Sequence, residues 1–214
     1  NNISYDEYLI ELEKQKKDFY KVQTEMLKET STYIKTRYSI LTLAFKQIIE
    51  IDPKFSDLFM MISIIDSQNI PRKLLERHYD THTLNRFISE LKKHSLITEE
   101  GMISTLSTFS IHRSTQDICH VFFMQNFNLT PQHPSIIAIG NTFEGYLNDL
   151  IDVENYIQIS LIVPHCKNII NSHLLPKTMK GVISVTLGWT FFCLGKDALA
   201  HQFLEEGICD LKSG

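Results

Sequence analysis

The sequence predicts a mainly α-helical protein with one small element of β structure. Along most of the 214 residues, apolar side chains recur three and four positions apart, the spacing that places them on one face of a helix. Only the stretch 95–111 departs from this period, because its β-branched residues and serines alternate around Glu100 and Gly101, a predicted hairpin turn. Gly, Pro and Asn residues separate the helical segments, as is usual at helix ends.

The composition narrows the class of protein. Hydrophobic residues make up 43% of the chain and charged residues 21%, which is typical of a soluble globular protein. The net charge of -4 leaves no overall basic field, so nucleic-acid binding would require a local patch. The four cysteines form no C-x-x-C pair, which favours buried thiols in a reducing, cytoplasmic compartment over disulfides or a zinc site.

The sequence also predicts no membrane association. No apolar run reaches the roughly 18 to 20 residues that a membrane-spanning helix requires. The opening residues "NNISYDEYL" are neither basic nor apolar enough for a signal peptide. We expect these residues to continue a longer chain.

Residues 1–50 are predicted to form a helical unit. Ser4 and Glu7 match the S-x-x-E capping box, which marks the beginning of a helix. The stretch 38–51, "YSILTLAFKQIIEI", again carries apolar residues three and four positions apart and predicts an amphipathic helix.

Residues 51–128 are predicted to form a winged-helix domain. After Pro53 come three helical segments, "KFSDLFMMISIID", "IPRKLLERHY" and "TLNRFISELKKHSLI". The hairpin at 95–111 follows, and "RSTQDICHVFFMQNF" returns to the helical period. Three helices followed by a small hairpin are the elements of a winged helix.

Residues 129–214 are predicted to form antiparallel helix pairs. The last 34 residues carry the pattern of a tetratricopeptide repeat, in which Leu-Gly, an aromatic residue, Ala, a large apolar residue and a small one recur at fixed places: Leu187, Gly188, Phe191, Ala200, Leu204 and Gly207. The small residues among these would let two helices approach closely. Ser184 and Lys212 depart from the pattern, where Trp and Pro are usual. The stretch 131–180 is long enough for one further pair.

The order of these parts resembles the C-terminal half of STAND-type NTPases, which carry an NB-ARC module. This group includes plant disease-resistance proteins and bacterial homologues with tetratricopeptide repeats. The resemblance covers nearly the whole chain and rests on the order of six motifs: "ISYDEYLIEL", "YSILTLAFKQI", "FSDLFMMISIIDSQNIPRKLLE", "FISELKKHSLI", "FSIHRSTQDI" and "ISLIVPHCKNII". It implies the regulatory and interaction portion of a nucleotide-switched signalling protein. An upstream domain would bind ADP or ATP, and the helical repeats would bind a protein or peptide.

The resemblance also implies a role for His112. In that family, the histidine of a Met-His-Asp motif on the winged helix reaches the β-phosphate of bound ADP. The matching positions here are Ile111, His112 and Arg113, so only the histidine is retained. An imidazole at a strand-to-helix corner can donate to a phosphate oxygen, assisted by the amides of the helix N-terminus. The alternative is that His112 caps the helix or bonds a local carbonyl.

No catalytic or metal site is predicted. The sequence contains no recognisable catalytic triad, paired carboxylates or metal cluster, so we expect no enzymatic activity and no cofactor in this portion alone. His78 and His82 are four positions apart, but no third ligand follows, so two exposed polar residues are favoured. "GWTFFCLGKD" fails as a phosphate loop, because Thr190 and Asp197 stand where Gly and Ser or Thr are needed.

The alternative function is a winged-helix DNA-binding transcriptional regulator with a helical ligand- or protein-sensing domain. Its recognition helix would be the third helix of the winged-helix domain. The outward residues of that helix form a mixed set that includes an acid: Asn85, Arg86, Ser89, Glu90, Lys92 and Lys93. Because few further basic groups surround them, nucleic-acid binding is the less favoured interpretation.

Overall fold

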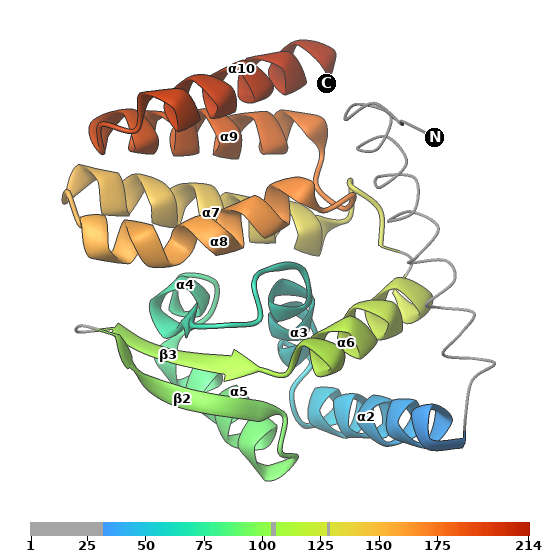
Figure 1. The fold of residues 1–214 in the computed structure, drawn as a ribbon. Coiled ribbons are helices and arrows are strands. Elements are labelled where there is room, and N and C mark those ends of the chain that lie inside the picture. Colours follow the sequence, from blue (N-terminus) through green and yellow to red (C-terminus); the bar gives the residue numbers. More distant parts are fainter. Residues whose placement is uncertain (1–31, 104–105, 128) are drawn as a thin grey trace, which may run out of the picture. The chain divides into compact units, whose positions relative to one another are not determined.

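The computed structural model describes residues 32–103, 106–127 and 129–214 (Figure 1). Contacts divide the chain into two compact units, residues 1–44 and 45–214, with the division inside helix α2 (Thr32–Ile51). The last turns of α2 belong to the second unit, and the division into 1–50, 51–128 and 129–214 stays a prediction. The predicted capping box lies outside the described residues.

The predicted fold class is confirmed, because the described residues are mainly helical with one small antiparallel sheet (Figure 1). The first part of the second unit, here called the winged-helix region, has the order of helices and strands that the sequence predicted. Its elements are α3 (Phe55–Ile64), β1 (Ile70–Pro71), α4 (Arg72–Glu76), α5 (Thr81–Lys93), β2 (Ile97–Ile103), β3 (Leu106–Ile111) and α6 (Arg113–Asn126).

Two details of the sheet differ from the prediction. The sheet has three strands in the order β1-β3-β2, because Ile70 of β1 pairs with Phe109 of β3. A strand of two residues is too short to show a period of its own, so the sequence could not reveal β1. The turn predicted at Glu100 and Gly101 is wrong, since Gly101 lies within β2 opposite Thr108. The strands connect at 104–105, outside the described residues.

The core of the winged-helix region surrounds α3, which is buried on most sides as its apolar sequence predicted. Phe59 lies at the centre of an aromatic cluster. Its ring centroid is 5.2 Å from that of Phe45, 4.9 Å from that of Phe87 and 6.1 Å from that of Phe123. The Gln116 side chain of α6 donates to two carbonyl oxygens at the end of α3, both at 2.8 Å. These contacts join α6 to α3, because the amide satisfies carbonyls that would otherwise be buried without partners.

The second part, here called the helix-pair region, contains the helices predicted for the C-terminal residues. They are α7 (Pro134–Asp152), α8 (Tyr156–Asn171), α9 (Lys177–Cys193) and α10 (Asp197–Ser213). Figure 1 shows α7 beside α8, and α9 beside α10. The stretch 131–180 carries no recognisable repeat pattern, yet it forms the helix pair α7 and α8. It also contains the first residues of α9.

Helices α9 and α10 approach to backbone contact, as the small residues predicted. A Cβ atom added at Gly207 would lie 2.8 Å from the carbonyl oxygen of Gly181, and one added at Gly188 would lie 3.0 Å from the amide nitrogen of Leu204. Ala200 is also buried at this contact, with its carbonyl oxygen 3.1 Å from the same added atom at Gly188. Glycine is therefore required at 188 and 207 for the pair to keep its spacing.

We expect Gly207→Leu to lower the free energy of unfolding by about 2 kcal/mol. Overpacking against backbone costs up to about 3 kcal/mol, whereas replacing Gly within a helix returns only about 1 kcal/mol. Urea denaturation of the 214-residue chain measures the difference. Ala198→Leu is the matched control, because Ala198 is exposed on the same helix. Equal stability of the two variants would contradict the close contact.

Polar side chains connect the helix-pair region to the winged-helix region. The Asn168 side-chain amide donates to an Asp66 carboxylate oxygen at 3.3 Å, and Arg77 of the turn after α4 pairs with Asp149 of α7. Nδ1 of His78 lies 2.9 Å from the Thr142 hydroxyl. The interpretation of His78 as an exposed residue is therefore wrong, because its side chain is half-buried and contacts α7.

His165 of α8 is a deeply buried polar group at this interface, with 1% of its surface exposed. Its Nδ1 atom has no hydrogen-bond partner among the described residues. Burial lowers the pKa of His165 to about 4, although the Asp66 carboxylate and hydrogen bonds with the backbone of Asn69 and Asp66 oppose the shift. The folded protein therefore keeps this imidazole neutral at neutral pH.

We expect His165 to make the protein sensitive to acid. The pKa of His165 falls from 6.5 to about 4 on folding, so the unfolded chain binds more protons between these values. The stabilising contribution is complete above about pH 6.5 and is lost as the pH falls towards 4, by about 3 kcal/mol.

His165→Gln removes the titrating group, so its free energy of unfolding should fall less steeply between these pH values than that of the wild type. Urea denaturation at a series of pH values measures the slopes. His173→Gln, at an exposed histidine, controls for the loss of one imidazole. Identical pH profiles for His165→Gln and the wild type would contradict this account.

Candidate functional site

The structure places His112 where the sequence predicted it, between the end of β3 and the first turn of α6. Ile111 is buried, and its amide donates to the Ser67 carbonyl at 2.9 Å, which anchors the end of the strand. His112 is exposed and is the N-cap residue of α6. Its carbonyl oxygen accepts hydrogen bonds from the amides of Thr115 and Gln116 at 2.8 and 3.0 Å.

The imidazole of His112 takes part in the cap through one nitrogen. Nδ1 accepts from the Ser114 amide at 3.2 Å and lies 2.7 Å from the Ser114 hydroxyl. A nitrogen that accepts from an amide carries no proton, so this pattern assigns the hydrogen of the neutral ring to Nε2. His112 can therefore cap the helix and still present a donor at Nε2. The capping role and the phosphate-sensing role are compatible in this geometry.

The surroundings of His112 combine charges of both signs. Arg113 is exposed at the first position of α6, where the helix N-terminus also favours an anion. Asp117, one turn further along, is half-buried, and burial raises its pKa while Arg113 and His112 oppose that shift. A phosphate at this corner would lie near the imidazole of His112 and the guanidinium of Arg113, with the half-buried carboxyl group of Asp117 one turn away.

Substitutions at His112 should separate the capping hydrogen bond from the other properties of the imidazole. We expect His112→Ala to lower the free energy of unfolding by about 1 kcal/mol, because the alanine leaves the Ser114 amide without its acceptor. His112→Asn supplies a side-chain oxygen that caps well and should recover most of the loss. Urea denaturation of both variants makes the comparison. Equal destabilisation by Ala and Asn would show that the cap contributes nothing.

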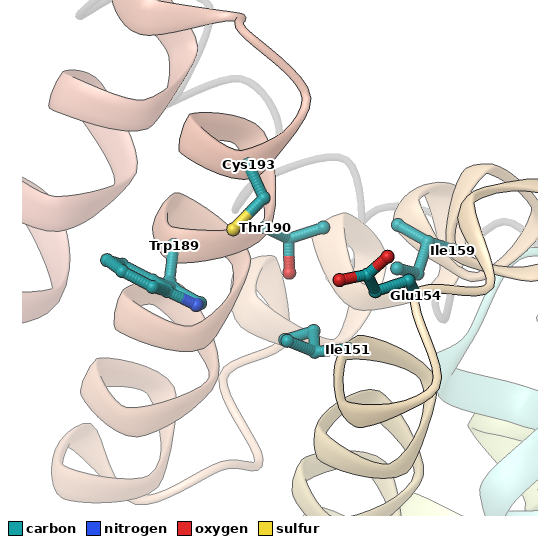
Figure 2. Close-up of a pocket in the computed structure, with 6 residues that line it drawn as sticks. All are labelled: Ile151, Glu154, Ile159, Trp189, Thr190 and Cys193. Carbon is teal, nitrogen blue, oxygen red and sulfur yellow. The ribbon is translucent and has the colours of Figure 1, made fainter.

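A second candidate site lies between the end of α7, the beginning of α8 and the C-terminal half of α9. The cavity has a volume of about 210 Å³, and Figure 2 shows the side chains that line it: Ile151, Glu154, Ile159, Trp189, Thr190 and Cys193. The sequence did not predict this site, and Trp189 appears there only within the stretch that fails as a phosphate loop. The available signal was Trp189 itself, the single tryptophan of the chain, three positions before Phe192.

Exposed aromatic side chains border this cavity. Trp189 and Phe192 are 52% and 56% exposed, and their rings stack with centroids 5.5 Å apart. Val153 directly precedes Glu154 and Ile157 follows it three positions later, and both side chains are also exposed. Large apolar groups gathered on a protein surface are typical of a site that binds another molecule.

Glu154 occupies an unusual backbone position in the connection between α7 and α8. Its φ angle of 51° lies in the left-handed region that favours glycine.

 The Asn155 amide bonds the Leu150 carbonyl at 3.0 Å, and the Glu154 amide bonds that of Ile151 at 3.0 Å, which together form a helix-ending motif that usually carries glycine. A carboxylate therefore stands at the cavity where the backbone alone would favour Gly.

The outward face of α5, where a DNA reader would carry its recognition residues, is occupied by contacts within the chain. Arg86 pairs with Asp52 at 3.0 Å and lies over the Phe55 ring, and Lys93 pairs with Glu90. Each of these pairs neutralises a cation that phosphate binding would need. Phosphate binding would have to displace these partners, and the DNA-binding alternative stays the less favoured prediction.

The described residues contain no group of three or more His, Cys, Asp or Glu that could hold a metal ion. None of the described helices is both long and apolar enough to cross a membrane. Comparison of the chain with protein-family models, curated proteins and solved structures gives no match.

Proposed function

We propose that this chain is the regulatory and interaction portion of a nucleotide-switched signalling NTPase of the STAND type. The observation that carries the proposal is the position of His112, an exposed N-cap whose Nε2 hydrogen can be donated while Nδ1 caps α6. This geometry suits a contact with a phosphate of a nucleotide held mainly by another domain. The resemblance in the order of motifs along the chain supports the same function.

In this proposal, His112 stabilises the ADP-bound, inactive state. The amides of the α6 N-terminus and the Arg113 guanidinium add to the attraction for a phosphate. The backbone-amide loop, the lysine and the acidic residues that phosphoryl transfer requires belong to an upstream domain, because this sequence contains no recognisable motif for them. The chain alone therefore neither hydrolyses ATP nor binds it tightly.

The helix-pair region is the output of the proposed switch and binds a cytoplasmic protein or peptide. The exposed pair Trp189 and Phe192 supports this role, since aromatic residues commonly dominate the energetics of protein interfaces. Contacts such as those of His165 and Asn168 with the segment after α3 would couple this region to the winged-helix region. A change in nucleotide state at His112 could then alter the exposure or position of the binding surface.

We expect His112→Asn in the intact protein, with its nucleotide-binding domain, to weaken ADP retention by about 10-fold or more. The lost charge-assisted hydrogen bond is worth about 1.5 to 3 kcal/mol, whereas asparagine preserves the cap and the fold. The dissociation constant for ADP and the signalling output are measured for both proteins. His82→Asn is the matched control, because His82 is exposed in the first turn of α5. Wild-type ADP affinity in a folded His112→Asn protein would refute the sensor role.

A further inference from the structure

The cavity beside Trp189 has the chemistry of a pocket for one cationic side chain. Figure 2 shows the Glu154 carboxylate and the Trp189 indole among its walls, with Ile151 and Ile159 adding apolar surface. We propose that this pocket receives an arginine or lysine side chain of a partner protein. This inference rests on the proposed protein-binding function and names the chemistry that the partner must present.

The size of the cavity favours a single side chain. Its volume of about 210 Å³ lies below the roughly 300 to 1,000 Å³ of pockets that hold complete small-molecule ligands. Apolar walls suit the carbon stem of a long basic side chain, whose charged end remains close to a carboxylate. An extended peptide could therefore place one side chain in the cavity and rest apolar neighbours on the exposed rings.

The charge of the lining residues selects a cation. Glu154 is the charged residue among those that line this cavity, and none of the ion pairs between described residues includes its carboxylate. The face of an indole ring attracts a cation through its quadrupole, and Trp is the most effective aromatic residue for this contact. The Thr190 hydroxyl already donates to the Thr186 carbonyl at 2.8 Å, so its oxygen can still accept from a guanidinium. An anionic partner would instead be repelled.

The same helix already makes contacts of this kind with lysines of its own chain. The Lys167 and Lys196 ammonium groups both lie 5.9 Å from the centroid of the Phe191 ring, and that of Lys167 lies 5.7 Å from the centroid of Phe203. Within the part of the chain that the structure describes, no lysine or arginine lies over the Trp189 ring in this way. A lysine or arginine of a partner could make the same kind of contact with the Trp189 ring.

The backbone of Glu154 supplies independent support and a sharp test. A left-handed φ angle strains any residue other than glycine, and such strain often marks a functional position. Glu154→Gly should therefore stabilise the fold while it removes the carboxylate.

The test uses Trp189 as its own reporter, because it is the single tryptophan of the chain. The probes are a blocked pentapeptide Gly-Leu-Arg-Leu-Gly and the same peptide with neutral, nearly isosteric citrulline in place of arginine. We expect the arginine peptide to change the Trp189 emission saturably and to bind the 214-residue chain about 10-fold more tightly than the citrulline peptide. Glu154→Gly should unfold at a higher temperature than the wild type and bind both peptides equally.

Asp152→Asn is the matched control, because it removes an exposed carboxylate two residues away and should leave the preference for arginine intact. Equal binding of both peptides by the wild type would overturn the cation pocket but leave a protein-binding surface. A preference that survives in Glu154→Gly would overturn the role of Glu154. No saturable response to either peptide would overturn the pocket, whereas the switch itself is tested separately by ADP retention.

Discussion

The burial of α3 is the constraint on which the rest of the winged-helix region depends. Its apolar side chains are covered on most sides, with Phe59 at the centre of an aromatic cluster. Gln116 then ties α6 to the carbonyl end of α3, and the thiol of Cys119 lies 3.7 Å from the Phe59 carbonyl oxygen. Because α6 is held in this way, the strand-to-helix corner that carries His112 has a defined position.

The segment that leaves α3 carries the same constraint into the helix-pair region. Asp66 follows the end of α3 and accepts a hydrogen bond from Asn168 of α8, beside the buried His165. A buried imidazole with an unpaired nitrogen is costly, so such an interface is held by the surrounding packing rather than by its own hydrogen bonds. The interface therefore joins the winged-helix region to the helix-pair region through an imidazole whose neutral form the fold requires.

The contact between α9 and α10 explains why large aromatic groups of α9 are exposed. Gly181 and Gly188 lie on the face of α9 that touches the backbone of α10, so that face has no room for bulky side chains. Trp189 and Phe192 lie on other faces and remain accessible beside the connection between α7 and α8. Close packing on one side of the helix thus accompanies exposed aromatic side chains on another.

The sequence by itself determined the features that depend on neighbouring residues along the chain. Period and turn residues predicted the helices, the glycines predicted the close approach of α9 and α10, and the change of period placed His112 at the beginning of α6. Only the tertiary structure decided features that need partners distant in sequence. β1 exists because Ile70 meets Phe109, His78 is half-buried because Thr142 lies beside it, and the cavity forms where α7, α8 and α9 converge. Local patterns report which face of a segment is apolar, but they do not report which distant segment will cover it.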